Sequence, residues 1–271
     1  MFSARHIAVN RESQLAAELL GQGVTALGKA NHAQTGLYWQ AFFGLSIGLE
    51  RLCKLIFISD HAIRNAGFFP TNTELRSFGH EITVLLSKCD VIGDSLGKEK
   101  GVKDRPRDPI HVAIEQVLSA FATQTRYYNL NHLTGGSGSQ RDPIALWWKS
   151  VAMPICDRHY SIQRRKRDER NVMFAEMAFG RNSLVFHVSE EGDLIDEIRT
   201  FFARSGPTRI AQMYGRMYVL QIVRWLASIL YELAHEGGYR KGIEELVGMH
   251  EHFAKYNNED SYFRQRKTWS S

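Results

Sequence analysis

Apolar residues recur every three or four positions along most of the chain, and this spacing predicts a mostly helical protein. The clearest example is the stretch 37–57, "LYWQAFFGLSIGLERLCKLIF". Its Glu50 and Lys54 lie four positions apart, where they form a favourable pair on the exposed side of a helix. The other side is an apolar stripe that we expect to be buried, made of Phe42, Leu45, Leu49, Leu52 and Ile56.

A second helix is predicted over 71–86, "TNTELRSFGHEITVLL". Thr71 and Glu74 have the spacing of a capping box, which favours a helix start at this point. The segment 91–109 that follows is dense in glycine and charge, and so predicts a mobile connection. The apolar stripe of this second helix consists of Leu75, Phe78, Ile82, Leu85 and Leu86.

A third helix is predicted to start near Ile110, and Arg126 lies on the side away from its apolar stripe. Gly135 and Gly136 are natural helix stops, so we expect the last turn to loosen and His132 to turn toward Arg126. Small or short side chains beside Arg126 would let another helix approach closely. The buried stripe is predicted to contain Ile110, Ile114, Val117, Phe121 and Tyr128, and the small-residue face Ser119, Ala122 and Asn129.

The fold class that these patterns predict is all-α, with a helical bundle over 1–135 and a second, basic helical region over 136–271. The boundary is placed in the Gly/Ser-rich stretch 134–143, which is typical of a linker. Trp147 and Trp148 are expected in the core or at an interface between the two regions. Further elements are predicted as a Trp-rich helix cut at Pro154, a helix over about 161–179, a short strand in "SLVFHV", a helix opened by Ser189, and helices over about 209–235 and 240–255.

The formal charge is +5 with a pI near 9.1, and the excess is concentrated in the runs 158–170 and 262–269. Basic patches flanked by aromatic residues attract polyanions and can stack on unpaired bases. The alternative is a solvated helix face and a frayed tail. The residues that we expect to hold a nucleic-acid strand are Arg164, Arg165, Lys166, Arg167, Arg264, Arg266 and Lys267.

Cys53, Cys89 and Cys156 are far apart in the sequence, which suggests neither a disulfide framework nor a thiolate metal site. His250 and His252 would point in opposite directions on a helix, so we expect no metal site at this pair. We expect no other metal and no cofactor. The first residues lack the apolar core of a signal peptide, and no stretch approaches the roughly 18 uncharged apolar residues of a membrane span. The expected location is the cytoplasm, away from any membrane.

The segments "GLERLCKLIF", "FGHEITVLL" and "RYYNLNHL" resemble the HEPN superfamily (higher eukaryotes and prokaryotes nucleotide-binding) over about residues 35–135. The resemblance implies a small helical bundle that commonly dimerises. Many members are metal-independent endoribonucleases marked by an arginine followed, after four to six residues, by a histidine. Here five residues separate Arg126 from His132, although Tyr127 stands where a polar residue often follows the arginine. The resemblance also implies a toxin or phage-defence role, with an antitoxin or another regulatory partner.

Metal-independent RNA cleavage needs a base for the ribose 2′-hydroxyl, an acid for the leaving oxygen, and positive charge at the phosphate. His132 suits proton transfer, and the guanidinium of Arg126 can hold two phosphate oxygens. One histidine is too few for both an acid and a base, so a homodimer that brings two dyads together is the expected active form. Tyr127 and Asn129 are expected to hold the scissile phosphate or a nearby base.

A structural interpretation of the same residues stays open. Arg126 is then an exposed helix residue, and His132 is a cation that stabilises the last carbonyl groups of its helix. The protein would then be a non-catalytic helical module that binds a partner protein, a nucleotide or a nucleic acid through the same face.

Overall fold

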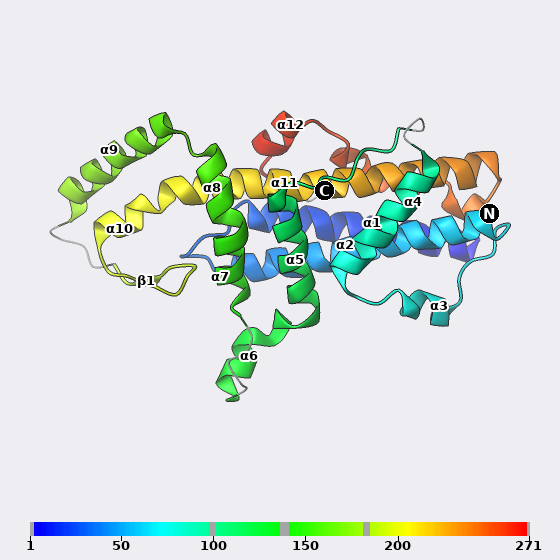
Figure 1. Ribbon diagram of the computed structural model, residues 1–271, viewed down its shortest axis with the longest axis horizontal. Helices are drawn as coiled ribbons and strands as arrows, with labels where there is room; N and C mark the ends of the chain where they lie inside the picture. The colour runs from blue at the N-terminus through cyan, green and yellow to red at the C-terminus, as the bar shows by residue number, and fades with distance from the viewer. Residues whose placement is uncertain (1–2, 98–100, 136–140, 181–184, 270–271) are drawn as a thin grey trace.

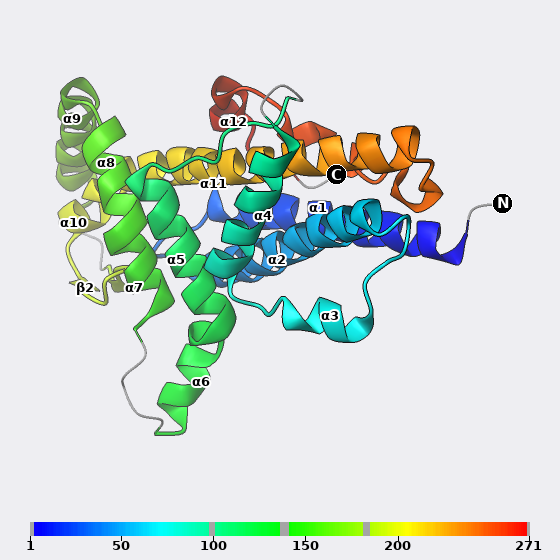
Figure 2. The same cartoon turned by 45° about the vertical axis from the view of Figure 1, so that its right-hand side comes forward.

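The computed structural model describes residues 3–97, 101–135, 141–180 and 185–269 of an all-α protein. Three long helices lie side by side along the long axis of the molecule (Figures 1 and 2). They are α1 (Ala4–Leu27), α2 (Gly36–Arg64) and α11 (Ser205–Ala234).

α1 and α2 pack with their backbones close together. A Cβ atom added at Gly44 would stand 2.9 Å from the carbonyl oxygen of Leu19 and 3.1 Å from the backbone nitrogen of Gly23. Only a residue without a side chain fits this crossing without displacing a backbone. The apolar stripe predicted for α2 is confirmed, because Phe42, Leu45, Leu49, Leu52 and Ile56 are all buried.

The predicted second helix is two helices. The capping box at Thr71 and Glu74 is present, but it begins the short α3 (Asn72–Ser77). Gly79 then adopts φ +77°, a left-handed conformation that ends the helical path. The apolar positions Ile82, Leu85 and Leu86 belong to a separate helix, α4 (Ile82–Leu96), and are fully buried.

The Trp-rich helix does not stop at Pro154. α7 (Pro143–Trp147) continues through the wide turn η3 (Trp148–Ala152) into α8 (Met153–His159). A π-type turn just before a proline accommodates a residue that has no N–H to donate. Trp147 and Trp148 are 2% and 6% exposed, which confirms them as core residues.

The predicted basic helix is confirmed as α9 (Ile162–Phe179), and the strand predicted in "SLVFHV" is confirmed at residues 187–188, where it forms one side of a hairpin. β1 (His187–Val188) pairs antiparallel with β2 (Leu194–Ile195). The hydroxyl of Ser189 accepts bonds from the amides of Glu191 and Asp193, so it closes this turn instead of opening a helix. α10 (Ile198–Ala203) begins only afterwards.

The C-terminal end is more irregular than the sequence predicts. α11 runs on into the turn η4 (His235–Arg240), and the predicted helix over 240–255 is wrong. Gly242 and Gly248 take φ values of +70° and +81°, which breaks that segment into two short 3₁₀ turns. These are η5 (Glu244–Leu246) and η6 (Glu251–Tyr256), and α12 (Asp260–Gln265) follows them.

The apolar core is one cluster that includes residues of both predicted regions, 1–135 and 136–271. α11 packs against α1, α2, α4 and α5 (Pro109–Thr123). The predicted linker 134–143 lies partly outside the described residues, and the boundary there stays a prediction.

Among the described residues, the helical run Ile198–Arg240 is long and apolar enough to cross a membrane by length and composition alone. Its apolar window is 72% buried inside the protein. Such burial is typical of the core helix of a globular protein.

We predict that Gly44→Ala lowers the free energy of unfolding by about 1–3 kcal/mol, because the new methyl group forces the backbones of α1 and α2 apart. Gly36→Ala is the matched control, since no atom lies within 4 Å of its added Cβ. Urea unfolding measures both variants. Equal stability of the two variants would show that the helix crossing is loose.

Candidate functional site

The helix that carries Arg126 is interrupted before it reaches that residue. α5 ends at Thr123, and Gln124 leaves helical geometry at φ −131° and ψ −50°. The hydroxyl of Thr123 bonds to the carbonyl oxygen of Ser119 at 2.9 Å, a contact that tends to bend helices. The prediction of one continuous third helix is therefore wrong, since the chain continues as the turn η2 (Thr125–Tyr127) and the short α6 (Tyr128–Leu133).

α6 projects from the body of the molecule as an arm in both views (Figures 1 and 2). Exposed apolar side chains lie along it. Tyr127 is 59% exposed, Leu130 is 58% exposed and Leu133 is 82% exposed. We call η2 and α6 together the arm.

Arg126 is half-buried at the base of the arm. Its guanidinium lies 5.9 Å from the centre of the Phe43 ring, and one amino group makes a long bond of 3.4 Å to the carbonyl oxygen of Ala122. Its Nε is buried and has no hydrogen-bond partner. Within the described ranges no carboxylate pairs with this guanidinium, so none of these residues neutralises its charge.

His132 is exposed near the tip of the arm. Its ring packs edge-on against Tyr128, with the ring centres 4.5 Å apart. In the part of the chain that the structure describes, no hydrogen bond or ring contact joins it to Arg126. The expected turn of the imidazole toward Arg126 is thus not seen in the single chain.

The predicted small-residue face is only partly open. Ser119 is 6% exposed, and its hydroxyl lies 3.5 Å from the hydroxyl of Thr83, so α4 already covers it. Ala122 is half-buried and Asn129 is exposed. The surface that remains open for contact is the arm, one turn beyond the predicted face.

The basic residues of α9 and of the tail are divided between internal contacts and solvent. Four of them contact other residues of the chain. Arg165 bonds to the carbonyl oxygen of Tyr160 and Arg167 contacts Asp168, while Arg264 lies near the Tyr214 ring and Arg266 near the Trp269 ring. No side-chain partner occurs among the described residues for Arg164, Lys166 and Lys267.

The tail is not frayed, because Phe263 and Trp269 are fully buried. The indole N–H of Trp269 donates to the carbonyl oxygen of Arg266 at 3.0 Å. In both views, α9 and α12 lie on the side of the molecule opposite the arm (Figures 1 and 2). A single chain therefore does not bring these basic residues to Arg126 and His132.

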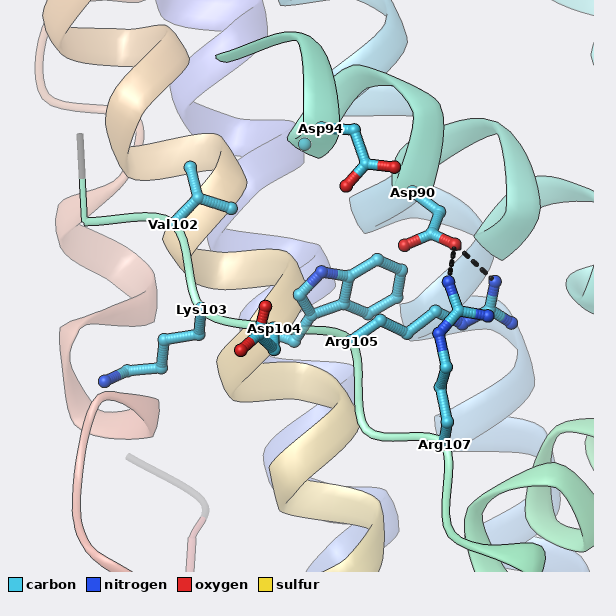
Figure 3. A pocket seen from close by; sticks show the side chains of 9 residues that line it. Asp90, Asp94, Val102, Lys103, Asp104, Arg105 and Arg107 are labelled. Carbon is cyan, nitrogen blue, oxygen red and sulfur yellow. Dashed lines mark hydrogen bonds and ion pairs between the residues drawn. The ribbon is translucent and has the colours of Figure 1, made fainter. Parts of the chain in front are cut away.

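The segment 101–107 is anchored, although a mobile connection was predicted there. Arg105 donates to Glu115 at 2.6 Å and to Asp90 at 3.4 Å, and Arg107 donates to Asp90 at 2.5 Å. Figure 3 shows both guanidinium groups converging on Asp90, with Asp94 nearby on the same helix. These residues line a cavity of about 320 Å³. Because its arginines are paired with carboxylates, we interpret it as structural.

The described residues contain no group of three or more His, Cys, Asp or Glu side chains placed to hold a metal ion. The three cysteines are buried and unpaired. Burial raises the pKa of the Cys156 thiol to about 11, so this group stays protonated near neutral pH.

No protein-family model matches this chain, and no curated protein or solved structure matches it. The resemblance to the HEPN superfamily therefore stays a prediction. The all-α fold rests on the helices described above.

The structure adds residues that the sequence did not single out. Arg158 and His159 lie at the end of α8, and they meet Tyr214 and Tyr218 of α11. The available signals were the Arg-His pair at the start of the basic run and two tyrosines four positions apart. Neither sequence feature shows that Arg158 and His159 contact the two tyrosines, because that contact depends on how α8 packs against α11.

Arg105→Ala is expected to lower the free energy of unfolding by about 3–5 kcal/mol, because Glu115 is left buried without its partner. Arg107→Ala is the control, since that side chain is 67% exposed and its loss is expected to cost less than about 1 kcal/mol. Chemical unfolding distinguishes the two. A small effect of both substitutions would contradict an anchoring role for the segment.

Proposed function

We propose that this protein is an RNA-binding, metal-independent endoribonuclease that acts as a homodimer through its arm. The observation that carries the proposal is the state of Arg126. A half-buried guanidinium that has one long hydrogen bond, and no carboxylate partner among the residues that the structure describes, is poised to take an anion from outside the chain. It stands six positions before an exposed imidazole.

The chemistry divides between the two side chains. Arg126 holds the scissile phosphate and stabilises the charge that develops on its oxygens. His132 takes the proton of the ribose 2′-hydroxyl in one subunit and donates a proton to the leaving 5′-oxygen from the other. The unperturbed pKa of an imidazole, about 6.5, allows both roles near neutral pH.

In a dimer, a second copy of the chain supplies the second histidine that the reaction needs. The arm exposes Tyr127, Leu130 and Leu133, and pairing two arms would remove these apolar side chains from water. Pairing two arms about a two-fold axis would bring both dyads to one phosphate, so that one His132 can act as the base and the other as the acid.

RNA would be held by the cationic groups that the protein leaves unpaired. Arg164, Lys166 and Lys267 have free side chains among the described residues, whereas Arg165, Arg167, Arg264 and Arg266 also have contacts inside the chain. Asn129 is exposed beside the dyad, where it and Tyr127 can contact a phosphate or a base. Such contacts give binding a strong dependence on salt.

This activity suits a cytoplasmic toxin or phage-defence effector that an antitoxin or another regulatory partner restrains, as the resemblance implies. The second candidate is a non-catalytic module that binds a partner protein, a nucleotide or a nucleic acid. The exposed apolar side chains of the arm favour a protein partner in that case.

The first test is cleavage of a mixed RNA pool in the presence of a chelator. His132→Ala is expected to lower the cleavage rate by about 100-fold or more, the usual contribution of a general acid or base. Arg126→Ala is expected to lower it by about 10-fold or more, because a charge-assisted hydrogen bond to the phosphate is lost. The matched controls are His252→Ala on η6 and Arg11→Ala on α1, which keep the dyad intact.

Cleavage that persists in His132→Ala would overturn the assignment of the dyad. If the wild type binds RNA with a steep salt dependence but does not cut it, the protein is a binding module. Each variant is first checked for folding by circular dichroism.

The role of the arm has its own test. Leu133→Asp is expected to convert the dimer to a monomer in sedimentation velocity, because a carboxylate would be buried between the paired arms. Leu194→Asp on β2 is the matched control, since this leucine is also exposed, at 53%. An unchanged dimer in Leu133→Asp would place the contact elsewhere.

A further inference from the structure

The two basic runs of the sequence meet on one aromatic ring. His159, the last residue of α8, stacks on Tyr214 with the ring centres 3.8 Å apart and the planes 6° from parallel. The guanidinium of Arg264, from α12, lies 5.9 Å from the centre of the same ring. Residues about a hundred positions apart in the chain therefore form one cluster on α11.

Tyr218 joins the cluster one turn further along α11. Its hydroxyl oxygen lies 3.0 Å from an amino group of Arg158 and 2.9 Å from Nε2 of His159. Because the arginine can only donate, the hydroxyl proton is free to bond to Nε2. With this bond accepted at Nε2, the neutral imidazole carries its proton on Nδ1.

The cations of this cluster are incompletely paired. Arg158 contacts Asp108 at 2.7 Å, and that pair is 43% and 33% exposed. Arg264 contacts the sulfur of Met217 at 3.5 Å and the Tyr214 ring, but no described carboxylate pairs with it. The two guanidinium groups and the imidazole thus gather on Tyr214 and Tyr218, and among the described residues Asp108 is the one carboxylate that pairs with them.

Burial lowers the pKa of His159, and the positive charges of Arg158 and Arg264 lower it further, against the opposing effect of Asp108. The ring is therefore neutral near pH 7. In the Nδ1–H tautomer the ring supplies a third donor to the cluster, and three such donors can match the several oxygens of one phosphate group.

We propose that Arg158, His159 and Arg264 form a binding site for a phosphate group at the junction of α8, α11 and α12. The phosphate belongs either to a free nucleotide or to an RNA strand, and both present the same oxygens to these donors. A face of the Tyr214 ring is occupied by His159, so recognition rests on the phosphate and not on base stacking there.

This site is independent of the dyad on the arm. Arg158 also has a structural role, because it ties α8 to Asp108 at the start of α5. Arg264 makes no ion pair with any described residue, so no structural role accounts for its positive charge. Arg264 is accordingly the residue to change first.

Phosphate binding and the protonation of His159 are linked. A bound phosphate offsets the charges of Arg158 and Arg264, which removes a cause of the lowered pKa, so the pKa of His159 rises on binding. A ligand that raises the pKa of a group binds more tightly as the pH falls through that range. A phosphodiester probe keeps its own charge constant there, so any pH dependence belongs to the protein.

The experiment uses the full chain carrying His132→Ala, so that RNA is not cut. The two probes are adenosine monophosphate and a 2′-O-methyl oligonucleotide without terminal phosphates, measured by titration calorimetry at two pH values. Arg264→Gln is expected to weaken binding by about 10-fold or more. Arg240→Gln, which removes the same charge from an exposed pair at η4, is expected to leave binding unchanged.

Binding of the nucleotide alone, weakened by Arg264→Gln, supports the site and identifies a small ligand. Binding of the oligonucleotide alone, weakened by the same substitution, supports it and identifies an RNA strand. Wild-type-like affinity of Arg264→Gln for both probes, or no binding of either probe, would overturn the proposal. Imidazole nitrogen signals of His159 provide a second readout, because phosphate at the site must raise the titration midpoint of this ring.

Discussion

Burial of α11 is the constraint on which the rest of the structure depends. This 30-residue helix buries side chains around most of its circumference, so every neighbouring element must cover part of it. α1 and α2 cover one part, α4 and α5 a second part, and α8 and α12 a third. The two halves of the chain share this core.

The two proposed sites differ in their relation to that core. The arm leaves it, because the chain departs from helical geometry at Gln124, and its exposed apolar side chains project away from the body of the molecule. The phosphate site lies on the core, where Tyr214 and Tyr218 of α11 fix the positions of Arg158 and His159. A projecting surface suits a contact between copies, whereas a rigid surface suits recognition of one chemical group.

The elements that the sequence predicted well are those whose apolar residues follow one regular period, such as α2 and α11. The failures occur where a single backbone conformation interrupts that period, as at Gly79, at Gln124 and at Gly242. Hydrophobic periodicity is a property of a window of many residues, so it does not detect an irregular backbone conformation at a single residue. The helix predicted to start at Ser189 is wrong for a similar reason. A serine that can cap a helix can also close a turn, as the Ser189 hydroxyl does in this hairpin.

The sequence by itself determined that the protein is helical, which faces of its long helices are buried, and which residues carry charge. These properties depend on residue type and local spacing. Only the tertiary structure decided that no described carboxylate reaches Arg126, that α4 covers Ser119, and that the basic tail packs onto α11 beside the end of α8. The positions of such partners depend on how distant segments pack, which the spacing of residues along the chain does not specify.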